Sequence, residues 1–392
     1  SGTAPGNIGT PGAANTGGGA GAGSAPATGT GGTGGPGVVI LRSTSYLETD
    51  SACAPVQSPD GGTNEFIAQF NASANVIVGG SVPSIGFDYL IVAGGGGGGV
   101  TPATTYAGSG GGAGGLRTSF PGGTKVFLKT GTNYVNVGAG GAANVRGEDS
   151  SVGYITSSGG GGGASPESGA SATPGTGSYT RDGGSGAGGY MGEQPANQGP
   201  GPAFNRNPTR GGKGNIPVVF PGQGNDGGSP AQTGETAGGG GGGAGEAGVD
   251  APNCQSTPTG GRGGAGSPNS ISGSAVNYAG GGGGGVGYNG APAPGSAGAA
   301  SPCGTGGAGT KANNGTGGTG TVNRGGGGGG AQGSYNPSYN NSGGAGGSGV
   351  VILRIATACK PGSFAVAPGT NTTGVDGSCT VATFTVSGTL TL

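Results

Sequence analysis

Histidine and tryptophan are absent from this chain of 392 residues, and methionine occurs once. Histidine is the commonest general base and a frequent metal ligand, so its absence removes the usual centre of both kinds of site. Charge is also scarce: 14 basic residues balance 15 acidic ones, and charged residues make up 7% of the sequence. With no basic patch, nucleic acid is not an expected partner.

Long apolar runs are lacking as well. None approaches the ~18 residues of a membrane-spanning helix, so we expect no membrane span. The chain begins at Ser1 without a signal peptide, which indicates a processed mature chain or a segment of a longer one. The longest stretches free of Gly and Pro are 38–54 and 63–78, and both carry β-branched runs instead of a 3.6-residue period. A helical protein is therefore not expected.

What is abundant is glycine, with 113 residues, accompanied by 27 prolines. Five long glycine runs recur, at 94–99, 159–163, 238–243, 280–285 and 325–330. Collagen is excluded because no Gly-X-Y register exists. "LIVAGGGGGG" has the look of a phosphate-binding loop, but no helix-forming stretch follows it, and the pattern G-x-G-x-x-G arises by chance in so glycine-rich a sequence. Silk-like stacking would require a Gly-Ala alternation that is sparse here.

The remaining ordered structure for such runs is the polyproline II helix, which has three residues per turn and no internal hydrogen bonds. Its backbone groups must be satisfied by neighbours, and bare glycine lets these neighbours approach closely. Val, Ile, Tyr, Phe and Thr gather in short segments that are typical of strands, among them "FDYLIVA" at 87–93. We therefore predict an all-β fold: small antiparallel β-sandwiches plus a packed polyglycine/polyproline II bundle, with essentially no α-helix.

An internal repeat links the two ends of the chain. "GGPGVVILRS" at 34–43 matches "GGSGVVILRI" at 346–355, and "FNASANVIV" at 70–78 matches "FTVSGTLTL" at 384–392. The chain then holds about one and a quarter copies of one unit. We predict a glycine-rich end and closing strand of a preceding unit at 1–63, a complete unit at 64–355, and a connector with the opening strand of a following unit at 356–392.

The order of the motifs "FDYLIVAGGGGGG", "GGLRTSF", "TNYVNVGAGG" and "GVVILRI" resembles the glycine-rich domain of bacteriophage tail fibres and tail-tip adhesins, and of secreted surface proteins from environmental microbes. The resemblance covers most of the sequence. It implies a surface or fibre protein, located outside the cell or on a virion or cell surface. It does not imply one activity, because these domains serve in adhesion and in scaffolding.

No enzymatic site is expected, nor any cofactor or metal. The carboxylates are scattered, and the adjacent pairs Glu148–Asp149 and Arg181–Asp182 are typical of solvated turns. "GQGNDGGSP" at 222–230 occurs once, so we interpret it as a turn and not as a calcium repeat. Tyrosines in the glycine-rich loops either contact a receptor or sugar, or plug the ends of the bundle; we favour plugging. These are Tyr106, Tyr179, Tyr190, Tyr278, Tyr288, Tyr335 and Tyr339.

Five cysteines without a C-x-x-C spacing favour disulfides and an oxidising compartment over a zinc site. Proximity in the sequence suggests the pairs Cys254–Cys303 and Cys359–Cys379, which leaves Cys53 unpaired or intermolecular. Sequons begin at Asn71, Asn314, Asn340 and Asn371, which are the glycosylation candidates.

The function predicted from these observations is structural: a protomer of an extracellular filament that assembles head to tail with itself by strand complementation. Each end of the chain supplies part of a unit, and an unpaired strand edge invites a strand from another chain. The assembly residues are Val38, Val39, Ile40, Leu41, Phe384, Val386, Leu390 and Leu392. The alternative is a tail-fibre or tail-tip adhesin that binds a cell-surface glycan or receptor. Ice binding by a flat glycine face is a third, weaker alternative.

Overall fold

A computed structural model describes residues 11–13, 17–19, 33–43, 47–49, 56–59, 66–70, 76–78, 84–101, 107–163, 181–193, 206–208, 210–231, 236–252, 257–287, 298–333 and 341–392. The chain divides into an N-terminal unit, Ser1–Pro83, and a C-terminal unit, Ser84–Leu392. The described part of the protein is all-β with antiparallel sheets, as the sequence predicts.

The N-terminal unit contains β1 (Val39–Ser43), β2 (Leu47–Thr49), β3 (Val56–Pro59), β4 (Phe66–Phe70) and β5 (Val76–Val78). The C-terminal unit contains β6 (Ser84–Val92), β7 (Leu116–Thr118), β8 (Val126–Lys129), β9 (Thr132–Asn136), β10 (Ser150–Val152), β11 (Ile155–Ser157), β12 (Met191–Glu193), β13 (Arg206–Pro208), β14 (Ser267–Asn269), β15 (Val276–Tyr278), β16 (Val350–Ala356), a 3-10 turn (Thr357–Cys359), β17 (Ala365–Ala367), β18 (Thr372–Asp376), β19 (Cys379–Phe384) and β20 (Gly388–Thr391).

Strand β6 organises the C-terminal unit. It lies inside a six-stranded sheet of order β18-β19-β16-β6-β7, with β8 also paired to β6. Its second half, from Tyr89 to Val92, is buried on both faces and is accordingly rich in apolar residues. Phe87, Tyr89 and Ile91 join a core that also holds residues of the five-stranded sheet β11-β10-β9-β20-β17. The two sheets therefore pack in a sandwich-like arrangement around this core.

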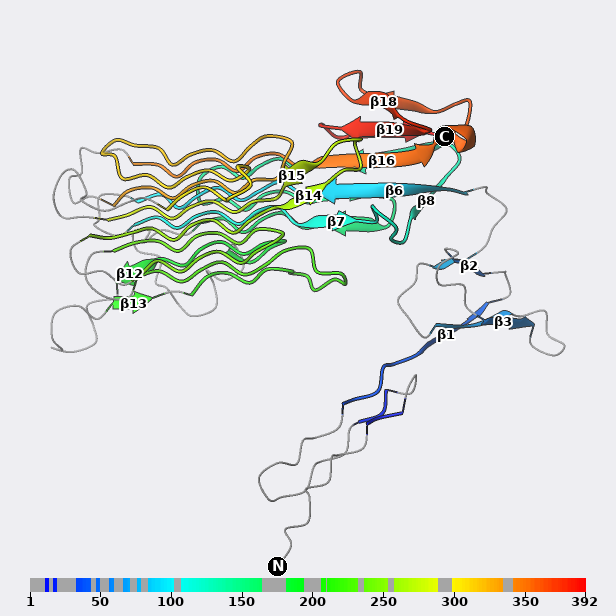
Figure 1. Ribbon diagram of the computed structural model, residues 1–392, viewed down its shortest axis with the longest axis horizontal. Helices are drawn as coiled ribbons and strands as arrows, with labels where there is room; N and C mark the ends of the chain where they lie inside the picture. The colour runs from blue at the N-terminus through cyan, green and yellow to red at the C-terminus, as the bar shows by residue number, and fades with distance from the viewer. Residues whose placement is uncertain are drawn as a thin grey trace, which may run out of the picture. The chain divides into compact units, whose positions relative to one another are not determined.

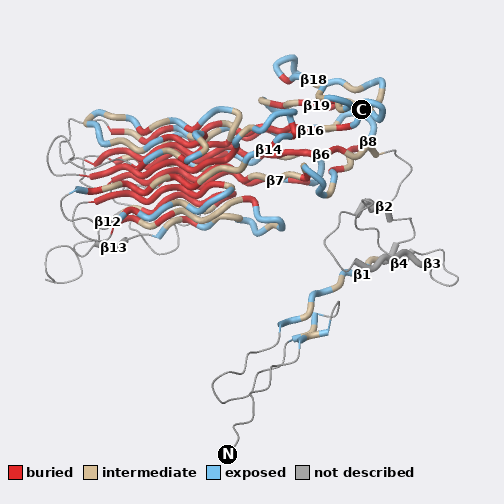
Figure 2. Tube along the Cα trace, in the orientation of Figure 1, coloured by how far each residue is buried: buried red, intermediate tan, exposed pale blue. Residues whose placement is uncertain are grey.

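The other face of the six-stranded sheet is covered too. Leu90 and Val92 of β6 pack with Ile271 and Tyr278 of the β14–β15 hairpin region. Figure 1 shows glycine-rich segments running side by side away from one end of the sheets, as undulating traces. Figure 2 shows the inner segments buried, and all five long glycine runs lie there. None of the helices among the described residues is long and apolar enough to cross a membrane.

The N-terminal unit repeats the strand pairing that closes the C-terminal unit. Its strands pair as β1-β4-β3 and β2-β5, while the last strands of the chain pair as β16-β19-β18 and β17-β20. The register is the same in both: Val39 lies opposite Phe70, and Val351 lies opposite Phe384. The repeat seen in the sequence is therefore a repeat of one five-strand arrangement.

The predicted unit boundaries differ from this structure. Residues 66–78 do not open the large unit, because β4 and β5 pair with β1, β2 and β3. Nor does the strand at 384–392 lack partners: β20 lies between β9 and β17. Similarity between 70–78 and 384–392 identifies equivalent strands, but it does not say which neighbour each strand finds. Both find theirs within their own unit.

Candidate functional site

The glycine run at 94–99 donates its N–H groups in a cycle of three. Every third donor goes to the same neighbouring segment: Gly96 and Gly99 to 109–112, Gly94 and Gly97 to 145–148, and Gly95 and Gly98 to 344–347. The carbonyls accept in the same cycle from 160–163, 141–144 and 328–331. The run is thus hydrogen-bonded to six flanking segments. No N–H of this run remains to hold a phosphate.

The run at 238–243 follows the same rule. Its donors go in turn to 282–285, 186–189 and 246–249, and its carbonyls accept from 261–264, 110–113 and 225–228. A Cβ built at Gly241 would lie on the carbonyl oxygen of Gly111, and one at Gly282 would lie on that of Gly328, far inside van der Waals contact. These positions are glycine because their neighbours approach the bare backbone itself.

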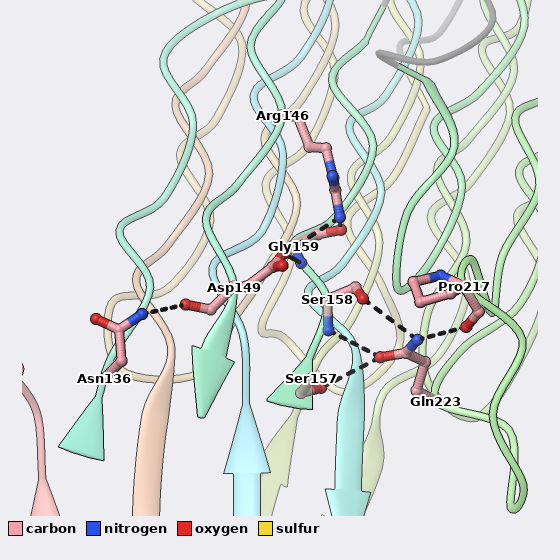
Figure 3. A network of polar contacts seen from close by, with 8 residues as sticks. All are labelled: Asn136, Arg146, Asp149, Ser157, Ser158, Gly159, Pro217 and Gln223. Carbon is pink, nitrogen blue, oxygen red and sulfur yellow. Dashed lines mark hydrogen bonds and ion pairs between the residues drawn. The ribbon is translucent and has the colours of Figure 1, made fainter. Parts of the chain in front are cut away.

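A polar network joins the five-stranded sheet to the glycine-rich segments (Figure 3). One half of the network surrounds Gln223, which is only 1% exposed. Its Oε1 accepts the N–H of Ser158 at 2.8 Å, just past the end of β11, and its Nε2 donates to the carbonyl of Pro217 at 3.1 Å. Gln223 therefore fastens the loop 215–221 to the edge of the sheet.

The second half of the network surrounds Asp149. Its Oδ1 accepts the N–H of Gly159 at 2.8 Å and Nη2 of Arg146 at 3.2 Å, and its backbone carbonyl accepts Nδ2 of Asn136 at 3.1 Å (Figure 3). The sequence predicted a solvated turn here, and the carboxylate is indeed about half exposed. Through these contacts Asp149 holds the first glycine of the run 159–163 in place, which is a structural role.

Loop 215–221 carries an exposed apolar tip that the sequence reasoning missed. Asn215, in a left-handed conformation at φ 54°, accepts the N–H groups of Val219 and Gln223 with its Oδ1, each at 3.2 Å. The loop so held exposes three large apolar side chains: Ile216 (39% exposed), Val218 (79%) and Phe220 (83%). The available signal was "IPVVFP", an apolar run interrupted and closed by prolines in a sequence with few such runs.

Replacing Gln223 by methionine should lower the free energy of unfolding by about 1–3 kcal/mol, because the buried N–H of Ser158 loses its acceptor while the volume stays similar. Denaturant unfolding measures this loss, and hydrogen exchange should show faster exchange in loop 215–221. The matched control is Asn136→Ala, an exposed member of the same network, which should stay within about 0.5 kcal/mol of the unsubstituted protein. Equal effects of the two substitutions would contradict the anchoring role of Gln223.

Acidic side chains elsewhere are paired at the edges of the glycine-rich segments. Glu246 meets Arg262 through both carboxylate oxygens, at 2.8 and 3.1 Å, and its Oε2 also accepts the N–H of Ala265 at 3.2 Å. The hydrogen bonds from Arg262 lower the pKa of Glu246 below its ordinary value. Both side chains are about one-third to one-half exposed, so the pair is a surface fastener.

This lowered pKa predicts a modest acid sensitivity. A carboxylate with a depressed folded-state pKa stabilises the fold above its unfolded pKa, and that contribution is lost as the pH falls through the folded value. Glu246→Gln should therefore flatten the decline of unfolding free energy below the ordinary titration range of glutamate. The effect should be less than about 1 kcal/mol because the pair is exposed. Urea titrations at a series of pH values measure it, and a steeper decline in the variant would contradict the assignment.

The cysteines do not support the predicted disulfides. Cys303, Cys359 and Cys379 are free thiols, and Cys53 and Cys254 lie outside the described residues. The Cys359–Cys379 pair is absent because the register places Ala356 opposite Cys379, whereas Cys359 lies three residues further on, in the exposed 3-10 turn. Cys303 accepts the N–H of Gly266 at 3.1 Å and contacts the hydroxyls of Ser301 and Thr305.

Two of the glycosylation candidates can be placed. Asn371 is 4% exposed; its Nδ2 donates to the carbonyl of Ala367 and its Oδ1 accepts the N–H of Thr385. A glycan on this amide nitrogen would need space that its buried position does not offer, so the structure speaks against this site. Asn314 is exposed in a turn at φ 55°. Asn71 and Asn340 lie outside the described residues.

Two of the seven tyrosines in the glycine-rich loops lie among the described residues, Tyr190 and Tyr278. Tyr278 is buried at the base of the glycine-rich segments, with the guanidinium of Arg324 5.1 Å from its ring centroid. Tyr190 is half-buried at the end of its segment. Tyr278 has the plugging position that the sequence favoured. The other five, Tyr106, Tyr179, Tyr288, Tyr335 and Tyr339, lie outside the described residues.

The predicted assembly residues fall into two groups. Phe384, Leu390 and Leu392 are buried in the core of the C-terminal unit, and Val386 is 42% exposed. In the N-terminal unit, Val38 and Leu41 are half-buried, whereas Val39 and Ile40 are 57% and 60% exposed. Their equivalents by the shared register, Val351 and Ile352, are 0% and 2% exposed.

Comparison of this protein with protein-family models, with curated proteins and with solved structures finds no match in any of the three. Within the described ranges, no cluster of three or more acidic or cysteine side chains has the arrangement to hold a metal ion. Among the described residues, the features that stand out are thus the hydrogen-bonded glycine runs, the polar contacts at their ends, the exposed apolar loop 215–221 and the exposed strand β1.

Proposed function

We propose that this protein is a structural protomer of an extracellular filament, which assembles head to tail with copies of itself. Its glycine-rich segments form a bundle of polyproline II helices, and this bundle is the rigid body of the protomer. The three-residue cycle of hydrogen bonds supports this reading, because three residues make one turn of that helix. So does the use of every backbone N–H and C=O group in the runs 94–99 and 238–243 for bonds to neighbouring segments.

One observation carries the self-assembly. The N-terminal unit has the pairing register of the strands that close the C-terminal unit, yet it exposes Val39 and Ile40 where the C-terminal unit buries Val351 and Ile352. Adjacent residues of a strand point to opposite faces, so both faces of β1 are open. Among the described residues β1 also has a partner strand, β4, on one edge only, and an unpaired edge is a site for pairing with another chain.

Electron microscopy of the full-length protein over a range of concentrations tests the proposal. Filaments with a regular axial repeat should form, and their length should grow with protein concentration. Val39→Lys combined with Ile40→Lys should shorten them without unfolding the C-terminal unit. A protein that stays monomeric at high concentration would overturn the proposal.

A second function, adhesion at the tip of a fibre, is favoured by loop 215–221. A fastened loop that exposes Val218 and Phe220 is a suitable contact for a receptor surface or glycan. In an adhesin, Phe220→Ser should abolish binding of the protein to target cells and leave any filaments unchanged. In a purely structural protomer, neither readout should change.

A further inference from the structure

Comparison of β1 with its equivalent β16 shows which edge of β1 lacks a partner strand among the described residues. There, β16 has β19 on one edge and β6 on the other. Strand β1 has β4 on one edge and, among the described residues, nothing on the other. The glycines before it agree: Gly346 and Gly349 donate to the carbonyls of Gly141 and Gly138, whereas their equivalents Gly34 and Gly37 have no such bond within the described ranges.

A second copy of the protein does not offer a free β6 to fill this place. Strand β6 is already paired with β16 on one side and with β7 and β8 on the other. The strands with a partner on one edge only in the two larger sheets are β18, β7, β8, β11 and β17. Three of these have three residues each, and only β18 has five, which is the length of β1.

Strand β18 also lacks the devices that natural edge strands use against pairing. Thr372–Asp376 contains no lysine, no proline and no bulge, and four of its five residues are exposed. Its one carboxylate, Asp376, is neutralised by Arg354 at 2.6 Å. Val375 is 75% exposed, which gives this edge an apolar side chain to set against those of β1.

We propose that β1 of one copy pairs with the free edge of β18 in a second copy, so that the six-stranded sheet continues into the N-terminal unit of the next protomer. This inference rests on the proposed filament and names its contact. Each copy has one β1 edge and one β18 edge. The contact is therefore heterologous, and because it need not close on itself it propagates into a filament. Among the described residues both edges are without a partner strand, so this pairing breaks no strand pair described there.

Disulfide trapping tests the contact. Leu41 and Gly374 are the middle residues of the two five-residue strands, so they lie opposite one another whether the strands run parallel or antiparallel. Opposed residues have Cα atoms about 4.5–5.5 Å apart, which suits a disulfide. A Cβ at Gly374 meets no atom within 4 Å, so Gly374→Cys is tolerated. The double variant Leu41→Cys/Gly374→Cys is made in a Cys359→Ser background, because Cys359 is exposed.

Mild oxidation of this variant should give a ladder of covalent dimers, trimers and longer species on a non-reducing gel. The matched control is Leu41→Cys/Gly362→Cys, since Gly362 also has open space for a Cβ but lies in a turn outside β18. The control and the Cys359→Ser parent should give no ladder. A disulfide formed only within one chain, or a ladder of equal strength in the control, would overturn the contact.

A second arm does not depend on disulfide chemistry. Val375→Lys places a charge on the β18 edge and should shorten assemblies by about tenfold. Tyr134→Lys is the control, because Tyr134 is 80% exposed but lies on β9, inside the five-stranded sheet. Filaments of normal length in Val375→Lys, with no ladder in the double variant, would overturn this contact and leave the filament standing. The absence of filaments from the unsubstituted protein would overturn both.

Discussion

Replacing Gly241 or Gly282 by valine is expected to lower the free energy of unfolding of the C-terminal unit by more than about 4 kcal/mol, far above an ordinary point substitution. At Gly241 the first atom of any side chain meets the carbonyl oxygen of Gly111. At Gly282 it meets that of Gly328. Both neighbours are backbone, so no rotamer change relieves the collision.

Displacing the neighbour is costly because each carbonyl is already in use. The oxygen of Gly111 accepts the N–H of Gly282, and the oxygen of Gly328 accepts the N–H of Gly111. A shift that makes room at one position therefore breaks hydrogen bonds at the next, and a buried N–H without a partner costs about 1–3 kcal/mol. The strain spreads through the lattice, since every run has several flanking segments.

Denaturant unfolding followed by circular dichroism measures the effect. Gly362→Val is the matched control: it is the same chemical change at a glycine whose Cβ would have no atom within 4 Å, and it should cost less than about 1 kcal/mol. If Gly241→Val proved as mild as Gly362→Val, the close backbone approach described for these runs would be wrong.

The hydrogen-bonded glycine runs also explain which features of the fold can be predicted from the sequence and which cannot. The all-β class follows from short β-branched segments, and "FDYLIVA" marks a strand that is largely buried on both faces. The need for glycine at the runs follows from close packing. Which segment lies beside which does not follow, because identical glycines carry no side-chain pattern that distinguishes one neighbour or register from another. The strands and fasteners at the ends of the runs must set that order.

The polar contacts of Gln223 could not be predicted from the sequence for a related reason. Gln223 contacts Ser158, 65 residues away, across segments whose adjacency the sequence does not encode. "GQGNDGGSP" was interpreted as a turn, and only the fold shows that its glutamine is buried. The predicted Cys359–Cys379 pair failed in the same way, because proximity in the sequence does not bring two Cβ atoms to bonding distance.

The chain end is where the sequence and the structure make opposite predictions. If 384–392 were an unpaired opening strand, deleting it would leave the large unit folded and abolish only long assemblies. In the structure, Phe384 and Leu390 are 0% exposed and lie in the core between the two larger sheets. We therefore expect the deletion to unfold the sandwich itself.

The substitution Phe384→Ala separates the two outcomes without shortening the protein. Phe384 lies opposite Val351 on the neighbouring strand and packs in the same core as Phe87. Removing a fully buried phenylalanine side chain costs about 3–5 kcal/mol in lost burial and cavity formation. Val386→Ala, two residues on and 42% exposed, should cost less than about 0.5 kcal/mol.

Urea unfolding of the two variants, with filament length measured on the same samples, checks this expectation. Phe384→Ala should shift the unfolding midpoint strongly, whereas Val386→Ala should leave it in place. Shorter filaments from a Phe384→Ala variant of unchanged stability would restore 384–392 as an assembly strand. A loss of stability instead places the polymer contact elsewhere, at edges that remain open once β20 is enclosed by β9 and β17.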